Sequence, residues 1–305
     1  MRPRRLIAFG LVAATLIACT KVPITGRRQF NLIPEGLMND LGTSTYKSML
    51  AEETVADKGD SNARIIKKVG QGIAKAANQK KYDWRFNLIK ANDTLNAWCL
   101  PGGKIAVYTG ILPVAENEAG LAFIMGHEVG HATAHHGSER LSQQLALLGG
   151  LGALYLYLDA KGDLKEKQIA TIVAAVGVGA QGAVILPFSR AHEKEADVIG
   201  MMYMAKAGYP PTEAPKMWTR MENHTGGSDV PVFLSTHPSN DQRKANLREW
   251  MPQAKKRYKR SQKKANAEQT LWTTGDFKSS GGGSKNSGTK NTKESSGSGG
   301  GKKSQ

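Results

Sequence analysis

The sequence predicts an α+β domain that is mostly helical, with a small antiparallel sheet beside its central helix. Residues 117–131 are rich in apolar residues after an acidic first turn, and residues 189–203 combine charges with an apolar stripe, so both segments predict helices. Alternating apolar residues at 84–88 and an apolar run at 105–108 predict strands. With 305 residues, of which 40% are hydrophobic and 22% charged, the chain can bury a substantial core.

A turn at residues 101–103, Pro-Gly-Gly, separates the second predicted strand from an exposed sheet edge. Four residues form that edge: Asn96, Ala97, Trp98 and Cys99. An extended peptide could add to this edge as a further strand. Cys99 itself is expected to pack as a small hydrophobic residue.

The apolar helix carries the sequence His-Glu-Val-Gly-His. His127 and His131 are four residues apart, so both imidazoles leave the same helix face and can share one tetrahedral Zn²⁺ per chain. Glu128 lies about 100° around the helix from His127, which suits a general base beside the metal better than a ligand.

A two-histidine site needs a third protein ligand. The extended form His-Glu-x-x-His-x-x-Gly-x-x-His is excluded, because this chain has Ala134 and Gly137 at the two further positions. His135 and His136 remain nearby, and we expect both to be structural or helix-end residues.

The charged helix supplies a carboxylate candidate. Ser189 is its predicted N-cap, and Glu193 and Asp197 share one face at a spacing of four. Glu193 is the candidate third ligand, and Asp197 is expected to orient a ligating imidazole. Glu195 points away from Asp197 and is expected to face solvent. An ordinary charged helix surface is the alternative for this stretch.

These two motifs together resemble the gluzincin peptidase family of HtpX, the CAAX prenyl protease and the mitochondrial Oma-type proteases. Within the family the resemblance is strongest to bacterial outer-membrane lipoproteins, namely LoiP and the peptidase domain of BepA. Four further segments resemble parts of these relatives, namely residues 23–29, 96–103 and 108–110, and Thr236-His237-Pro238 with Arg243. The resemblance covers about residues 23–250.

The resemblance implies a zincin-type metallopeptidase domain and assigns roles to individual residues. It makes Glu128 the general base and Asp197 the acid that orients a zinc ligand. The implied zinc ligands are His127, His131 and Glu193. It also makes His237 a candidate gating residue or fourth ligand, with a loop histidine that caps a turn as the alternative. The implied substrates are unfolded or misassembled cell-envelope proteins.

The N-terminus predicts a lipoprotein signal peptide over residues 1–18. Three arginines precede an apolar run over 6–18 that is shorter than the roughly 20 residues of a membrane span. The run ends at Cys19, which resembles the lipid-modified cysteine of bacterial lipoproteins; an ordinary signal peptide or short anchor helix is the alternative. Thr20 favours the outer membrane by lipoprotein sorting patterns. We therefore expect a lipid-anchored protein of the bacterial envelope that faces the periplasm.

The charge is concentrated at the ends of the chain. Of the formal net charge of +16, residues 1–18 carry +3 and residues 251–305 carry +10, which leaves residues 19–250 nearly neutral. A nucleic-acid partner is therefore not expected. Residues 19–254 form the predicted peptidase domain, and residues 255–305 a basic, Gly/Ser/Lys-rich disordered tail that is solubilising or docks to anionic lipid.

Two apolar stretches, residues 145–158 and 169–188, lie between the metal-binding motifs. We expect a helical pair that packs on the catalytic domain and partly covers the cleft. Partial insertion into a membrane surface is the alternative.

The motifs predict a zinc-dependent endopeptidase, and the resemblance implies that it acts in envelope protein quality control. A lipoprotein chaperone or assembly factor that binds clients in the same cleft with little turnover is the alternative. The residue that stabilises the oxyanion is not identified by the sequence; the candidates are His224, His237 and Tyr209.

Overall fold

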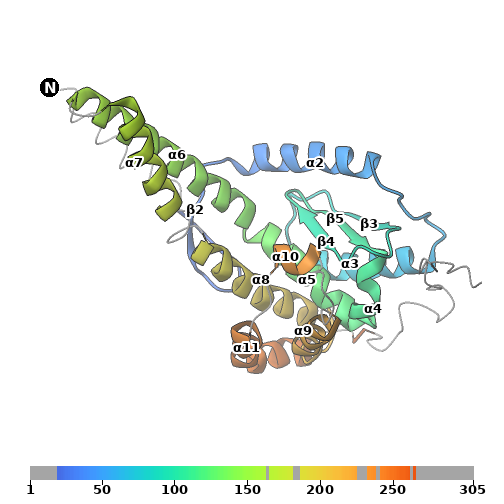
Figure 1. The fold of residues 1–305 in the computed structure, drawn as a ribbon. Coiled ribbons are helices and arrows are strands. Elements are labelled where there is room, and N and C mark those ends of the chain that lie inside the picture. Colours follow the sequence, from blue (N-terminus) through green and yellow to red (C-terminus); the bar gives the residue numbers. More distant parts are fainter. Residues whose placement is uncertain are drawn as a thin grey trace, which may run out of the picture. The chain divides into compact units, whose positions relative to one another are not determined.

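The computed structural model describes residues 19–162, 165–180, 186–224, 232–237, 241–261 and 264–265 (Figure 1). The predicted signal peptide and most of the predicted basic tail lie outside the described residues. Helices make up most of the described chain, so the mostly helical α+β class is confirmed. The helices are α2 (Glu35–Ala51), α3 (Ser61–Ala77), α4 (Leu112–Ala115), α5 (Glu118–Thr133), α6 (His136–Lys161), α7 (Glu166–Ala180), α8 (Leu186–Lys206), α9 (Glu213–His224), α10 (Val232–Thr236) and α11 (Asp241–Arg260), with a 3-10 turn at Thr109–Ile111.

The central sheet has three strands, β3 (Arg85–Ile89), β4 (Ala97–Leu100) and β5 (Lys104–Tyr108), in the order β3-β5-β4. β5 runs antiparallel to β4 and parallel to β3, so the sheet is mixed and the expectation of a purely antiparallel sheet is wrong. The reason is the tight turn after β4, where Gly102 and Gly103 adopt φ values of +80° and +82°. This turn returns β5 into the space between β3 and β4, where all of its residues are buried.

Helix α5 lies at the centre of the core, packed against β4 and against α8. Asn117 caps its first turn, since the Asn117 side chain accepts hydrogen bonds from the backbone N–H groups of Ala119 and Gly120 at 2.9 and 3.0 Å. Every residue of α5 except His131 is buried. Polar side chains on such a helix must find partners or bind a ligand.

Helices α5 and α8 approach until their backbones touch, because the facing residues are small. A Cβ atom at Gly200 would lie 2.6 Å from the backbone nitrogen of His127, and one at Gly126 would lie 2.8 Å from the carbonyl oxygen of Gly200. Ala196 meets Gly130 one turn further along. This contact brings the acidic residues of α8 to the histidines of α5.

Helix α8 begins at Leu186, so Ser189 lies inside the helix and is not its N-cap as expected. The apolar stripe of this helix is buried as expected: Ala196, Ile199, Gly200 and Tyr203 face the core.

The predicted helical pair exists as α6 and α7, which lie side by side (Figure 1). The pair does not cover the catalytic domain along its length, because burial in α6 ends at Ser142. Leu148 is 65% exposed and Leu156 is 67% exposed. Among the described helices, α6 has the length and apolar composition to cross a membrane, with little of it buried. Residues 181–185 of the second apolar stretch lie outside the description.

The C-terminal helix α11 continues to Arg260, past the predicted domain boundary at residue 254. Ala254 is buried and Tyr258 packs against the core, which gives this basic segment an apolar anchor. Three cations in its last turn also complement the helix dipole.

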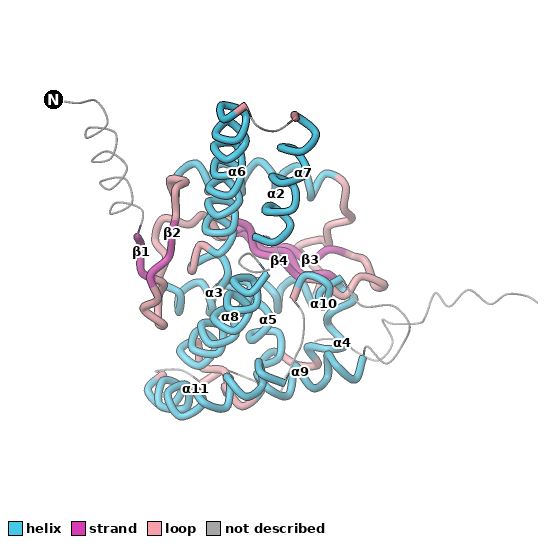
Figure 2. The backbone as a smooth tube through the Cα atoms, turned by 60° about the vertical axis from the view of Figure 1, so that its left-hand side comes forward, coloured by secondary structure: helices cyan, strands magenta, loops and turns pink. Residues whose placement is uncertain are grey.

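A short N-terminal hairpin joins β1 (Cys19–Lys21) to β2 (Arg28–Phe30), with Cys19 paired opposite Phe30. β2 runs beside the start of α6 (Figure 2). The Leu32 N–H, just beyond β2, donates to the Ser142 hydroxyl at 2.9 Å. The hairpin is therefore docked against the start of α6, the helix that follows the first of the two predicted metal-binding motifs.

Replacing Gly200 with Ala tests the contact between α5 and α8. The added methyl group meets backbone rather than a flexible side chain, so we expect the free energy of unfolding to fall by about 2 kcal/mol. Gly72→Ala is the matched control, because its Cβ would lie 3.8 Å from Ala207 in ordinary contact and the helix propensity gain is about 1 kcal/mol. Denaturant unfolding measures both, and equal stability of the two variants would contradict the tight contact.

Candidate metal centre

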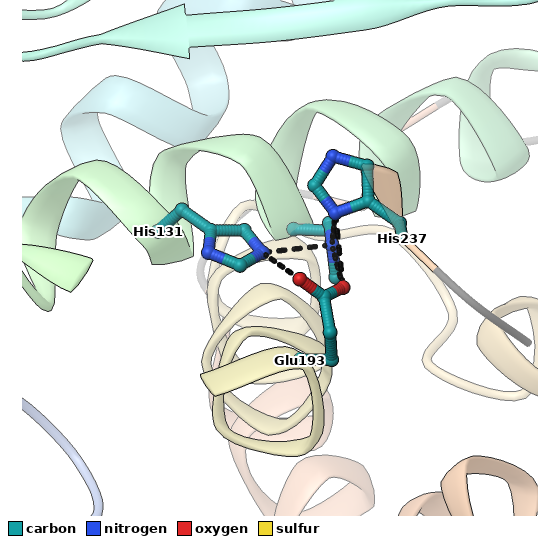
Figure 3. Close-up of side chains that lie close together, drawn as sticks. His131, Glu193 and His237 are labelled. Carbon is teal, nitrogen blue, oxygen red and sulfur yellow. Dashed lines mark hydrogen bonds and ion pairs between the residues drawn. The ribbon is translucent and has the colours of Figure 1, made fainter. Parts of the chain in front are cut away.

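Four side chains from three parts of the chain converge at one point. His127 and His131 come from α5, Glu193 comes from α8, and His237 follows α10. One ligand atom from each residue lies within 4.8 Å of the other three. Figure 3 shows His131, Glu193 and His237 pointing toward one another.

The distances suit a tetrahedral divalent ion. The Nε2 atoms of His127 and His131 are 3.1 Å apart, and His131 Nε2 lies 3.3 Å from Glu193 Oε1. His237 Nδ1 lies 2.9 Å from Glu193 Oε2. Ligand atoms that share such an ion at about 2.0–2.1 Å lie roughly 3.3 Å from one another, so the spacing fits. Imidazole nitrogens with a carboxylate are also the donor set of such sites.

His127 is oriented by a buried carboxylate. His127 Nδ1 lies 2.9 Å from Asp197 Oδ1, where Asp197 is fully buried. Burial acts to raise the pKa of Asp197, but the Arg243 charge and hydrogen bonds outweigh it and hold the pKa below its ordinary value. The ionised carboxylate accepts a hydrogen bond from the His127 Nδ1–H, which leaves the Nε2 lone pair directed at the other candidate ligands.

Arg243 is the counter-ion of this carboxylate. Its Nε and Nη2 atoms donate to the two Asp197 oxygens at 2.7 Å each, and the Trp218 ring nitrogen donates to Asp197 Oδ1 at 3.2 Å. The guanidinium also lies over the Trp218 ring at 3.9 Å and 3.2 Å from Glu193. The sequence linked Arg243 to the site only by resemblance and gave no sign of Trp218, because neither residue type forms a pattern by itself.

Glu193 is held as an anion. Burial acts to raise the pKa of Glu193, but the nearby His131 charge and the hydrogen bonds from His127, His131 and His237 lower it far below its ordinary value. An anionic carboxylate beside two imidazole nitrogens is the state a divalent cation requires.

Glu128 is buried beside this cluster. Its Oε1 atom has no hydrogen-bond partner in the part of the chain that the structure describes, and His237 Nε2 lies 3.6 Å away. Burial raises the pKa of Glu128 above its ordinary value. A buried carboxylate oxygen of this kind, facing a cleft, is available to water or a ligand.

The cleft runs between the ligand cluster and the edge of the sheet. Its lining includes Glu128, His131 and His237 on one side, and Trp98 and Cys99 of β4 on the other. Within the described sheet, β4 pairs only with β5, so its other edge faces the cleft side. Asn96 accepts from Tyr108 N–H at 3.0 Å just before β4 begins at Ala97.

His237 is positioned through the same edge. The Phe233 N–H of α10 donates to the Leu95 carbonyl at 3.0 Å, and the His237 N–H donates to the Phe233 carbonyl at 2.7 Å. Thus the segment before β4 fixes the short helix that carries His237. Pro238, the next residue of the predicted turn, lies outside the described residues.

Two expectations need correction. Tyr209 donates its hydroxyl to Glu118 at the start of α5, more than two turns before His127, and so is not at the site. His136 is buried at the first residue of α6, in keeping with a structural or helix-end residue, and its Nδ1 also lies 3.0 Å from His131 Nδ1. Glu195 is only 8% exposed, because the N-terminal hairpin covers that face of α8.

Comparison with known proteins identifies the family of this chain. The model of "Peptidase family M48" matches residues 60–251. The chain belongs to peptidase family M48. The family resemblance expected from the sequence is therefore confirmed.

Relatives within family M48 include mitochondrial and bacterial proteins. The chain is 31% identical over 236 residues to the mitochondrial metalloendopeptidase OMA1 of Schizosaccharomyces pombe, covering 76% of this chain and 66% of that protein. It is 30% identical over 263 residues to the Saccharomyces cerevisiae protein of the same name, covering 79% and 71%. It is 27% identical over 191 residues to the beta-barrel assembly-enhancing protease of Escherichia coli K12, covering 61% of this chain and 38% of that protein.

Proposed function

We propose that this protein is a zinc-dependent endopeptidase that hydrolyses peptide bonds in unfolded or misassembled cell-envelope proteins. The observation that carries the proposal is the convergence of His127, His131 and Glu193, with Glu128 buried beside them. Family membership supports peptidase chemistry.

In this proposal His127, His131 and Glu193 hold one zinc ion. When bound, zinc supplies Lewis acidity that polarises a peptide carbonyl and lowers the pKa of water to near 7. Asp197 orients His127, and Arg243 keeps Asp197 ionised, so that one ligand is fixed before the ion arrives.

Glu128 acts as the general base. It accepts a proton from the attacking water and then donates it to the leaving amine, which makes one carboxylate both acceptor and donor. Burial raises the pKa of Glu128, which makes it a stronger proton acceptor than an exposed carboxylate.

His237 serves as a gate. A catalytic zinc site keeps one position open, whereas four protein ligands close it. The closeness of His237 to the other three candidate ligands supports this role, and in the proposal His237 moves away when water and substrate enter. This closed arrangement also favours the second candidate function, a lipoprotein chaperone or assembly factor that holds clients in the cleft with little turnover.

The substrate lies along β4 as an added strand. Tyr108 N–H donates to the Asn96 carbonyl, so by the alternation of an antiparallel pair the backbone groups of Ala97 and Cys99 point to the free edge. A peptide that pairs with these groups passes Glu128 and His131, which line the same cleft. An extended, unfolded chain can adopt this geometry and a folded one cannot.

The cellular setting rests on the N-terminus and on the relatives. The name of the Escherichia coli relative links that protein to beta-barrel assembly, whereas the fungal relatives are mitochondrial. The basic and apolar residues before Cys19 favour a lipid anchor in the bacterial outer membrane, facing the periplasm. Two or more acyl chains on Cys19 would hold the protein stably to a bilayer.

Glu128→Gln tests the mechanism. We expect cleavage of a denatured porin or of casein to fall by a factor of about 10² to 10⁴, because the amide cannot accept the proton. The zinc content, measured by elemental analysis, should equal that of the wild type. A zinc chelator should abolish wild-type cleavage.

The same assay separates the two candidate functions. Wild-type protein with one zinc per chain that binds the denatured substrate but leaves it intact would support the chaperone and refute the peptidase. Unchanged turnover by the Glu128→Gln variant would refute the role of Glu128.

Cys99→Pro tests the edge strand. Proline removes one backbone donor at the free edge while the pairs with β5 remain. The loss of one hydrogen bond of about 1–1.5 kcal/mol predicts a roughly tenfold lower kcat/KM for an extended peptide. Cys99→Ala, which keeps the backbone N–H, should lose far less. Equal kcat/KM in the two variants would argue against strand addition.

Cys19→Ser tests the anchor. We expect the protein to move from the outer-membrane fraction to the soluble periplasmic fraction, because serine cannot carry the thioether-linked lipid. Cys99→Ser is the control and should stay with the membrane, since Cys19 and Cys99 are the two cysteines of the sequence. Membrane attachment of the Cys19→Ser protein would contradict the lipid anchor.

A further inference from the structure

The two histidines of α5 at the metal site differ in what their Nδ1 atom contacts, the ring nitrogen turned away from the site. His127 Nδ1 contacts a carboxylate directly, namely Asp197 at 2.9 Å. His131 Nδ1 instead lies 3.0 Å from the Nδ1 atom of another histidine, His136. A ligating imidazole almost always donates its outer N–H to an acceptor that fixes its tautomer and ring orientation.

His136 in turn contacts a carboxylate. Its side chain is 1% exposed, and its Nε2 atom lies 3.0 Å from Glu195 Oε2. When His131 Nε2 faces a metal, the His131 proton sits on Nδ1 and is donated to His136 Nδ1. His136 must then carry its own proton on Nε2, which it donates to Glu195. Glu195, as the final acceptor, thus determines which ring nitrogen of His136 and of His131 carries the proton.

Glu195 is held by the N-terminal hairpin. Arg27 Nε donates to Glu195 Oε2 at 2.9 Å, and the Thr25 hydroxyl donates to Glu195 Oε1. The contact between Arg27 and Glu195 joins residues 168 positions apart in the chain. The whole path from the hairpin to His131 lies within hydrogen-bond distance at every step.

Arg27 also binds a second carboxylate, that of Glu139. Its Nη1 and Nη2 atoms donate to the two oxygens of Glu139 at 2.9 and 2.7 Å. Glu139 accepts from His192 Nε2 at 2.9 Å, and the His192 ring stacks on the His136 ring with 4.2 Å between centroids. One guanidinium therefore fixes both the acceptor of His136 and the ring packed against its face.

We propose that Arg27, Glu195 and His136 are positioning residues that fix the tautomer and orientation of His131, as Asp197 does for His127. The inference deepens the proposed function and rests on its metal site. It gives the N-terminal hairpin a role at the metal centre: the docking of Arg27 sets the geometry of a ligand on α5.

Zinc affinity of the purified full-length chain is the direct test. Arg27→Gln and Glu195→Gln are each expected to weaken zinc binding by roughly 10- to 100-fold in competition with a chromophoric chelator. Arg27→Lys keeps the charge but loses the planar guanidinium that donates to both glutamates. Its zinc affinity should lie between those of the wild type and Arg27→Gln. The absorption spectrum of the cobalt-substituted protein should change in the same variants, because it reports ligand geometry.

Arg220→Gln is the matched control. Arg220 is 23% exposed against 29% for Arg27, and it also pairs with a glutamate, Glu213 at 2.6 Å. It contacts the backbone of α4 rather than the path to His131, so its loss should leave zinc affinity unchanged. Thermal unfolding of the metal-free proteins gives the stability cost of each variant separately.

A double variant tests whether the residues act in one path. Arg27→Gln with Glu195→Gln should weaken zinc binding no more than either single change, whereas independent effects would add. Should Arg27→Gln fail to fold, Glu195→Gln, which keeps the side-chain volume, decides the matter. Wild-type zinc affinity in a folded Glu195→Gln variant overturns the inference but leaves the proposed function standing. A wild-type chain that binds no zinc removes the proposed function itself.

Discussion

The close contact between α5 and α8 is the constraint on which the site depends. Because Gly126 and Gly200 have no side chains, the two backbones meet directly beside His127. At this separation Asp197 lies 2.9 Å from His127 Nδ1, and Glu193 lies 3.4 Å from His127 Nε2. A wider helix separation would cost both buried carboxylates their contacts with His127, and lost contacts of a buried charge are costly in a low-dielectric interior.

The site also depends on a balance of buried charges drawn from distant parts of the chain. On one side, Arg243 from α11 neutralises Asp197 and approaches Glu193. On the other side, Arg27 from the N-terminal hairpin forms ion pairs with both Glu139 and Glu195. The cluster of histidines therefore lies between two arginine–carboxylate groups. Each group fixes carboxylates, and each carboxylate contacts a histidine.

The sequence predicted the parts of the site that follow from helical spacing. His127, His131 and Glu128 share a short motif on one helix, and Glu193 and Asp197 share another, so their faces could be worked out locally. The burial of Glu195 could not be predicted in this way, because its partners lie on a hairpin far away in the sequence. Helical periodicity does not show which distant segments pack on a helix face. The parallel pairing of β3 with β5 and the exposure of α6 likewise depend on which elements meet, which periodicity does not reveal.

Anomalous X-ray diffraction across the zinc absorption edge, from crystals of the purified full-length chain, tests the central claim most directly. The account predicts a single anomalous peak bonded to the Nε2 atoms of His127 and His131 and to a Glu193 oxygen, at about 2.0–2.2 Å. A zinc ion bonded to other residues, or no peak at this point in zinc-supplemented crystals, would contradict it.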